Sequence, residues 1–250
     1  MNLHEFLIVC PLVFLAGFVD AIAGGGGLIS LPAYMFAGIP VHHAIATNKL
    51  SSATGTAVST WHLVKSKCVD ICLVPGTVAC AFVGSIAGAN LALIISDKVL
   101  KTVLVFVLPV VAFCVLRDKD LKPVIPEGFT RKKQYLIMAA CSFVIGIYDG
   151  FYGPGTGTFL LLTFTKLGKL DIEKATGNVK VVNLTSNISA LITFILAGKI
   201  LWVLGLSASI FSIAGHYLGA HMVVKNGVKV IKPIILLVLV LLMIKIILGI

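Results

Sequence analysis

Long apolar stretches alternate with short polar turns along nearly the whole chain. Eight of these stretches approach the roughly 20 residues that an α-helix needs to cross the hydrocarbon of a membrane. They cover residues 3–23, 44–64, 71–95, 99–116, 134–151, 175–197, 201–224 and 231–250. Two shorter stretches, 28–37 and 155–165, are too short to cross alone. The pattern predicts an all-α polytopic membrane protein.

Both short stretches follow a glycine-rich interruption of an apolar run. The interruptions read GFVDAIAGGGGLISLP over 17–32 and GIYDGFYGPGTGTFLL over 146–161, with Asp20 and Asp149 just before the glycines. A pair of Gly-interrupted hydrophobic segments at corresponding positions of two halves is typical of the midplane binding site of a secondary transporter. We therefore expect the functional site at these two breaks.

The duplication extends beyond the breaks. Asp20 and Asp149 are 129 residues apart, and Ala46-Thr47 precedes Ala175-Thr176 by the same interval. The other matches are Asn48 with Asn178, Lys49 with Lys180, Gly84 and Gly88 with Gly215 and Gly219, and Leu100-Lys101 with Ile231-Lys232. This predicts a first membrane repeat at 1–116, a basic linker at 117–133 and a second membrane repeat at 134–250.

Composition supports a membrane protein and argues against a nucleic-acid partner. Apolar residues make up 58% of the chain and charged residues 12%, with a mean hydropathy of +1.07. That much apolar surface needs lipid to cover it. The net charge of +10 comes from Lys and Arg in the turns between helices, where they record orientation. The cysteines lie inside apolar runs, so we expect free thiols and no metal site.

The Lys and Arg positions also test the topology. If every long segment crosses, they split nine against eight between the two sides. If each broken segment is a re-entrant helical hairpin followed by three transmembrane helices, the split is fourteen against three, namely Lys98, Lys101 and Lys199. The positive-inside rule favours this second arrangement, in which the two repeats are inverted. It places both termini outside the cytoplasm and the linker inside. A full crossing at 3–23 with a short return is the alternative.

The breaks are candidate anion sites. Non-helical backbone at membrane depth persists only inside protein or beside a watery cavity. A helix that begins after each break would point free N–H groups and a positive dipole end at the midplane, which suits a small anion. The candidate glycines are Gly24, Gly25, Gly26, Gly27, Gly153, Gly155 and Gly157, with Thr156 and Thr158 as hydroxyl donors. The alternative is that these glycines only permit tight packing.

Lys49 and Lys180 are candidate cations of the site. Both lie inside apolar runs, where charged side chains are costly and mark functional sites by default. The neutral hydrogen-bonding candidates beside them are Thr47, Asn48, Ser51, Asn178 and Asn183. The alternative is that both lysines reach the nearest membrane surface with their ammonium groups.

Asp20 and Asp149 have two interpretations. They pair with the lysines or cap the broken helices, or they take up protons and couple transport to a proton gradient. We favour structural pairing from the sequence, with coupling as the alternative. The pairs Gly84/Gly88 and Gly215/Gly219 fit the small-xxx-small pattern of close helix packing. We expect His216 and His221 beside the second pair to point in different directions.

The ordered set of these features resembles the TauE/SafE family of sulfite exporters and related anion permeases. It rests on Asp20 with Gly24–Gly27, on Ala46-Thr47-Asn48-Lys49, on Gly84 and Gly88, and on their second-half counterparts. The resemblance implies an inner-membrane transporter of sulfite, sulfonates or related small organic anions, often outwards, without a cofactor. Its partners would be the small anion and the lipid bilayer, with a homodimer left open. Pro154 in place of a glycine and the insertion between Thr176 and Lys180 depart from exact symmetry.

Three functional classes remain in view. The leading one is an anion transporter with alternating access between inverted halves. A passive anion channel is the second. The third is an intramembrane aspartyl-type enzyme, because Tyr148-Asp149 faintly resembles one such motif. That chemistry needs a second Gly-x-Gly-Asp element, which the sequence lacks, so we expect no enzyme activity.

Overall fold

The computed structural model describes residues 3–100, 102, 126 and 128–226, and within them the chain is helical without a strand. The elements are α1 (Leu3–Ala23), α2 (Gly27–Phe36), α3 (Val41–Lys65), the short 3-10 helix η1 (Ile71–Leu73), α4 (Val74–Ile94), α6 (Arg131–Phe151), α7 (Thr156–Lys166), α8 (Ile172–Leu196) and α9 (Trp202–Asn226). Most of the predicted helix at 99–116, most of the linker and all of 231–250 lie outside the described residues.

Five of the described helices are long and apolar enough to cross a membrane. They are Leu3–Ala23, Ile71–Ile94, Arg131–Phe151, Ile172–Leu196 and Trp202–Asn226. α3 is as long as α9, with 25 residues, but it carries many buried polar side chains because it runs through the middle of the molecule between α8 and α9. The protein is therefore a multi-pass, all-α membrane protein.

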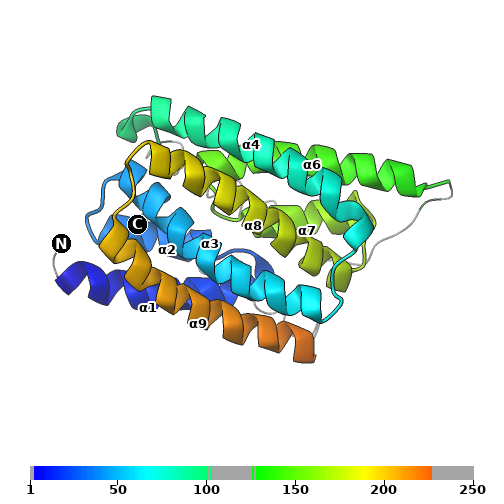
Figure 1. Ribbon diagram of the computed structural model, residues 1–250, viewed down its shortest axis with the longest axis horizontal. Helices are drawn as coiled ribbons and strands as arrows, with labels where there is room; N and C mark the ends of the chain where they lie inside the picture. The colour runs from blue at the N-terminus through cyan, green and yellow to red at the C-terminus, as the bar shows by residue number, and fades with distance from the viewer. Residues whose placement is uncertain (1–2, 101, 103–125, 127, 227–250) are drawn as a thin grey trace.

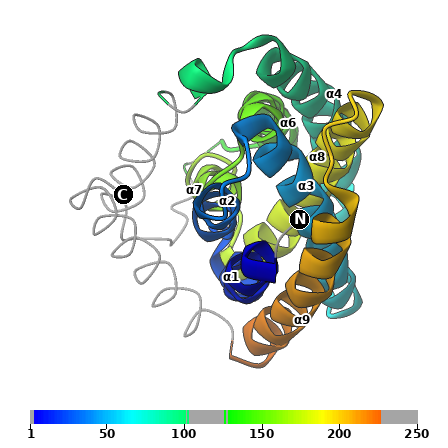
Figure 2. The same ribbon diagram turned by 90° about the vertical axis from the view of Figure 1, so that its left-hand side faces the viewer.

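Each predicted repeat contributes a helix that packs against a helix of the other repeat. α1 of the first half packs along α9 of the second, and α6 of the second half packs along α4 of the first (Figures 1 and 2). Glycines make these contacts close. A Cβ added at Gly84 or Gly88 would clash with the backbone of α6, and one added at Gly215 or Gly219 would clash with α1. The predicted packing role of both glycine pairs is confirmed.

The two central helices, α3 from the first predicted repeat and α8 from the second, run in opposite directions. Lys49 near the beginning of α3 contacts Asn187 in the second half of α8, whereas Thr60 near the end of α3 contacts Lys180 in the first half of α8. In Figure 1, α1, α3 and α9 run from left to right, and α4, α6 and α8 run from right to left. α3 and α8 are therefore antiparallel across the centre.

The two glycine breaks meet in the interior. After α1 ends, Gly24 adopts φ +76°, a left-handed conformation that glycine takes without strain. α2 then folds back along α1, with Gly26 against Ala16 and Asp20. A Cβ at Gly24 would clash with the backbone of Gly157, and a Cβ at Gly157 with Gly24. The hydroxyl of Thr158 completes the contact by donating to the Ala23 carbonyl at 3.0 Å.

Two apolar clusters surround the short helices. One includes Leu31 and Tyr34 of α2, and the other includes Leu161 and Phe164 of α7. Outward-facing apolar side chains such as Val203 and Ile210 on α9 are 63% and 68% exposed. Lipid is the natural cover for such residues in a multi-pass protein. The polar groups are thus concentrated in the interior, around the breaks.

Candidate functional site

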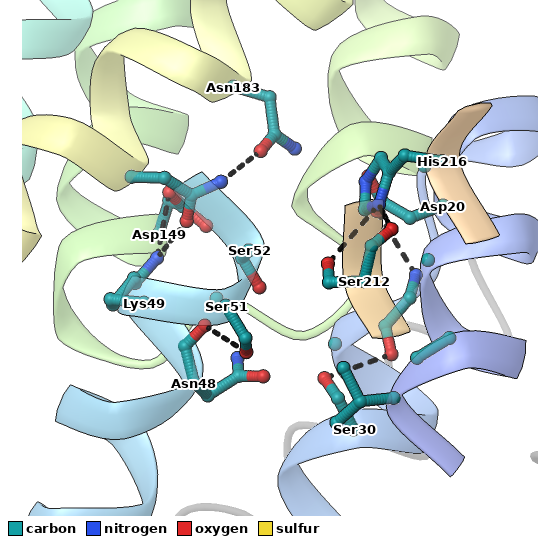
Figure 3. Close-up of a pocket in the computed structure, with 18 residues that line it drawn as sticks. Asp20, Ser30, Asn48, Lys49, Ser51, Ser52, Asp149, Asn183, Ser212 and His216 are labelled. Atoms are coloured by element: carbon teal, nitrogen blue, oxygen red, sulfur yellow. Dashed lines mark hydrogen bonds and ion pairs between the residues drawn. The ribbon is translucent and has the colours of Figure 1, made fainter. Parts of the chain in front are cut away.

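A small polar cavity lies where the two breaks meet. Its volume is about 30 Å³. Figure 3 shows polar side chains on its two sides, with Lys49, Asp149 and Asn183 on one side and Asp20 and His216 on the other. The complete lining is Val13, Ala16, Gly17, Asp20, Gly24, Gly26, Gly27, Ser30, Asn48, Lys49, Ser51, Ser52, Asp149, Gly153, Asn183, Asn187, Ser212 and His216.

Lys49 and Asp149 form a buried ion pair that joins the two halves. Their Nζ and Oδ2 atoms are 2.9 Å apart, and the two side chains are 3% and 4% exposed. Lys49 Nζ also donates to Asn187 Oδ1 at 3.0 Å. The hydroxyl of Ser186 donates to the same Asp149 oxygen, Oδ2, at 2.6 Å. α3 therefore supplies the cation, α6 the carboxylate and α8 the neutral partners.

Lys180 and Asp20 form the corresponding pair with the roles of the halves reversed. Lys180 Nζ lies 2.7 Å from Asp20 Oδ2 and also donates to the main-chain carbonyl of Asp20. His216 Nε2 lies 3.2 Å from the same Oδ2 atom. The second carboxylate oxygen, Oδ1, accepts from the N–H of Gly26 at 3.1 Å. Both oxygens of Asp20 are thus engaged.

The histidine is the main departure from symmetry between the two pairs. Its imidazole fits because Gly17 on α1 and Gly55 on α3 lack side chains: a Cβ at Gly17 would lie 2.7 Å from His216 Nδ1, and one at Gly55 would clash with it. The matching position in the first half, 131 residues earlier, is Ser85. Ser85 donates to the Ser186 carbonyl at 2.6 Å rather than to a carboxylate.

The glycine amides predicted to bind an anion are used partly by the protein itself. Gly24, Gly26, Gly27 and Gly153 line the cavity, while Gly25, Gly155 and Gly157 do not. The Gly26 amide donates to Asp20, so the carboxylate occupies the beginning of α2. This is the position that helix dipoles favour for a negative charge.

The predicted threonine donors are engaged with the breaks. Thr156 Oγ1 donates to the Gly153 carbonyl at 2.7 Å, and Thr158 donates to the Ala23 carbonyl. Two other candidates lie away from the cavity: Thr47 accepts from the Leu201 N–H at 3.1 Å, and the Asn178 amide donates to the Lys174 carbonyl at 2.9 Å. The contacts of Thr158 and Thr47 join separate segments of the chain, whereas those of Thr156 and Asn178 are local.

Asn48, Ser51 and Asn183 do line the cavity, as predicted for the neutral groups. Asn48 is 7% exposed, and its Oδ1 atom is buried without a hydrogen-bond partner in the described part of the chain. A buried amide normally has its partners satisfied. Because the oxygen and nitrogen of an asparagine amide exchange by a simple flip, either can meet a ligand in the cavity.

Sequence reasoning missed several lining residues: Ser30, Ser52, Asn187, Ser212 and His216. A signal for Asn187 was present, because Lys180, Asn183 and Asn187 fall at i, i+3 and i+7 in an apolar helix and so share a face. His216 directly follows Gly215 of the repeated glycine pair. Because that pair predicts close helix packing, there was no separate reason in the sequence to place His216 in the site. A titratable residue inside a membrane helix is nevertheless a functional signal in its own right.

The described residues contain no group of three or more His, Cys, Asp or Glu side chains that could hold a metal ion. Lysine, asparagine and serine side chains around the cavity have N–H and O–H groups that can donate to an oxyanion. The arrangement can bind a small negative group by charge and hydrogen bonds.

Comparison with known proteins finds similar membrane transporters. The family model described as "Sulfite exporter TauE/SafE" matches residues 9–246. A "Probable membrane transporter protein YfcA" of Escherichia coli (strain K12) is 37% identical over 229 residues, covering 90% of this chain and 82% of the relative. A "Probable membrane transporter protein ORF9" of Sinorhizobium sp is 34% identical over 237 residues, with 95% and 89% covered.

A "Probable membrane transporter protein" of Haemophilus influenzae is 34% identical over 225 residues, covering 90% of this chain and 87% of the relative. No solved structure matches the chain. The similarity extends over both halves and includes the helices that carry the two ion pairs.

Proposed function

The chain belongs to the sulfite exporter TauE/SafE family, and on this premise we propose that it exports a small anion such as sulfite, a sulfonate or a related organic anion. Its relatives are membrane transporters, and the chain is likewise a membrane transporter of a small molecule rather than an enzyme. The substrate, the direction and the mechanism of transport are our proposals.

The observation that carries this proposal is the cation at the cavity. Lys49 is 2% exposed and lies inside the membrane protein with its ammonium group at the cavity edge. Burying such a charge is costly even when it is paired, so a lysine at this depth marks a functional site by default. Asn48, Ser51, Asn183 and neighbouring serines supply hydrogen bonds without adding negative charge. This set fits a small oxyanion, for which one positive charge and several neutral donors suffice.

We infer that the two halves are inverted repeats, each with a re-entrant hairpin. Support comes from the antiparallel α3 and α8 and from the reciprocal packing of α1 on α9 and α6 on α4. The returning helices α2 and α7 have 10 and 11 residues, about 15 Å at 1.5 Å per residue, half of a typical hydrocarbon core. Such hairpins would begin and end on one side.

This arrangement supports a proposal of alternating access between the two halves. The first helix of each hairpin packs on a helix of the other half: α1 on α9, and α6 on α4. Rocking of the halves would therefore move both breaks relative to the central α3 and α8. A site at a repeat interface would then open to each side in turn, as in other transporters built from inverted repeats.

We also propose that the protein lies in the inner membrane with both termini outside the cytoplasm. Basic residues gather at one end of the molecule, where Arg131 at the start of α6 pairs with Asp70 and Lys174 at the start of α8 donates to the Lys67 carbonyl at 2.5 Å. At the opposite end, the turn between α8 and α9 has Lys199. The positive-inside rule assigns the basic end to the cytoplasm.

Sulfite counterflow in proteoliposomes tests the proposal. Liposomes loaded with unlabelled sulfite and containing the full chain should accumulate external labelled sulfite transiently and saturably. Lys49→Gln should abolish this counterflow while the protein still inserts. Lys65→Gln is the matched control, because Lys65 is an exposed residue at the end of the same helix. Flux that does not saturate and shows no counterflow would indicate a passive channel instead.

A further inference from the structure

We propose that the two ion pairs have different tasks: Lys49 passes from Asp149 to the substrate anion while Asp149 takes up one proton, and the Lys180–Asp20–His216 cluster stays closed as a structural tie between the halves. The inference rests on the proposed anion transport and assigns its binding and coupling residues. Transport would then move one anion and one proton together.

The first reason is access to the cavity. Lys49 and Asp149 both line it, as does Asn48 on the same helix as Lys49. The Oδ1 atom of Asn48 is buried and has no hydrogen-bond partner among the described residues. Lys180 is not among the lining residues, and its side chain is 1% exposed behind Asp20. An anion that enters the cavity therefore meets Lys49 directly, with Asn48 beside it.

The second reason is how firmly each carboxylate is held. The partners of Asp149, Lys49 Nζ and Ser186 Oγ, both contact the single oxygen Oδ2. Asp20 accepts on both oxygens, from Lys180, from the Gly26 amide and at His216. Lys180 holds Asp20 through the main-chain carbonyl as well. Separating Asp149 from Lys49 breaks fewer contacts than opening the other cluster.

The third reason is charge balance in the interior. Lys49 and Asp149 are neutral as a pair, and a monovalent anion added to them leaves one net negative charge in a low-dielectric site. When the site is open to one side, a proton from the water on that side converts the Asp149 carboxylate to a carboxylic acid and restores neutrality. Lys49 keeps its own proton and its charge, and the anion replaces the carboxylate as its partner.

Asp149 is the carboxyl group on its side of the cavity among the described lining residues. α3 presents Lys49 to it, and α8 presents only the neutral Ser186, Asn183 and Asn187. Near it on α6, Tyr148 donates its hydroxyl to the Pro154 carbonyl at 2.6 Å, and α4 contributes Ser85. The titratable groups across the cavity are Asp20 and His216, which are engaged with Lys180 and with each other.

The test compares sulfite affinity of the purified full chain with that of Asp149→Asn and Asp20→Asn between pH 6 and 8.5. Asp149→Asn leaves Lys49 without its carboxylate, so sulfite should bind more tightly than to the wild type. The ratio of wild-type to variant Kd should rise with pH, by up to about tenfold per pH unit where one proton is taken up. The ratio cancels the titration of sulfite itself, since both proteins meet the same ligand.

Asp20→Asn is the matched comparison, and it should lower thermal stability without producing this rising ratio. Equal tightening in both variants, a flat ratio for Asp149→Asn, or loss of sulfite binding in folded Asp149→Asn would overturn the inference while leaving anion transport standing. A wild-type protein that binds no sulfite would instead overturn the proposed sulfite transport and the inference with it.

Ser186→Ala keeps the inference testable if Asp149→Asn does not fold. It removes the hydroxyl that stabilises the ionised carboxylate but keeps both charges. Without the Ser186 hydroxyl, Asp149 should take up a proton more readily, because hydrogen bonds to charged groups are the stronger ones. Sulfite binding should then tighten by about tenfold at the upper end of the pH range. Unchanged or weaker binding in this variant would contradict the proposed transfer of Lys49.

Discussion

Buried charges at single positions dominate the interior of this protein. Lys49, Lys180 and Asp149 are each at most 3% exposed, and each has an opposite charge within hydrogen-bond distance on the other half. Removing one partner of such a pair leaves an uncompensated charge in a low-dielectric environment. Separating the halves would leave these charges unpaired in the interior, and this free-energy cost holds the halves together.

Lys180→Met tests this for the closed cluster. The variant leaves Asp20 with only His216 and the Gly26 amide, and the free energy of unfolding should fall by about 3–5 kcal/mol. The double variant Lys180→Met/Asp20→Asn removes both charges and should recover a large part of that loss. Denaturation of the purified proteins in detergent measures both. Additive losses in the double variant would show that the two residues do not act as a pair.

Gly24→Ala tests the contact of the two breaks. The new Cβ would clash with the Gly157 backbone, and φ is +76° at this position. Overpacking costs about 1–3 kcal/mol, and the left-handed conformation adds roughly 1–2 kcal/mol for a residue with a side chain. Gly38→Ala is the control, because Gly38 has φ +84° and a Cβ added there would meet nothing within 4 Å. Equal loss of thermal stability in both would show that the contact contributes nothing.

Part of the residue-scale picture could be predicted from the sequence. Asp20, Asp149, Lys49 and Lys180 stand out because charges are rare inside apolar stretches and because they recur in both halves. The sequence could not say that each lysine meets the aspartate of the other half, since nothing local encodes a distance between segments 100 or more residues apart. His216 was missed because the space for its ring comes from glycines on two other helices.

At the scale of elements, the helix starts show where the apolar pattern falls short. The predicted helices at 134–151 and 175–197 begin earlier in the structure, at Arg131 and Ile172. Polar first turns extend them beyond the apolar stretch, and side-chain caps fix their beginnings. Thr130 accepts from the Lys133 N–H, and Asp171 accepts from the Lys174 N–H at 2.9 Å. Hydropathy finds the span of a helix, whereas capping residues set its end.

The turn between α3 and η1 allows a prediction about thiol reactivity. Burial, reinforced by Glu173 at 3.4 Å from its sulfur, raises the pKa of the Cys68 thiol to about 11. A raised pKa means that the reactive thiolate is scarce at neutral pH, so alkylation at pH 8 should be on the order of a hundredfold slower than for an ordinary exposed thiol. Mass spectrometry of the alkylated protein measures the rate, which should rise until the pH approaches 11.

Glu173→Gln provides the control for this prediction. It removes the negative charge that contributes to the shift, so the Cys68 pKa should fall and its alkylation at pH 8 should become faster. The exposed Cys72 reports access of the reagent to the same turn. Rapid labelling of Cys68 at pH 7 in the wild-type protein would contradict the buried position of its thiol.

At the scale of the whole molecule, reciprocal packing between the two halves holds the fold together. Each half depends on the other, because α1 packs on α9, α6 packs on α4, and the carboxylates of Asp20 and Asp149 each meet the other half's lysine. The sequence predicts a repeat, and it shows the glycine breaks and an uneven distribution of basic residues. The contact between the two breaks could not be predicted, because two equivalent local signals carry no information about their separation in space.

The proposed opposite orientation of the halves predicts that matching residues are exposed on opposite sides of the membrane. Lys65 and Ala197 are exposed positions at the ends of α3 and α8, which run antiparallel and end at opposite ends of the molecule in Figure 1. In a background without the native cysteines, Lys65→Cys should react with a membrane-impermeant maleimide only from the cytoplasmic side, and Ala197→Cys only from the other. Intact cells and inside-out vesicles distinguish the two sides. Labelling of both positions from one side would mean that α3 and α8 do not cross in opposite directions, and the inverted arrangement would then be wrong.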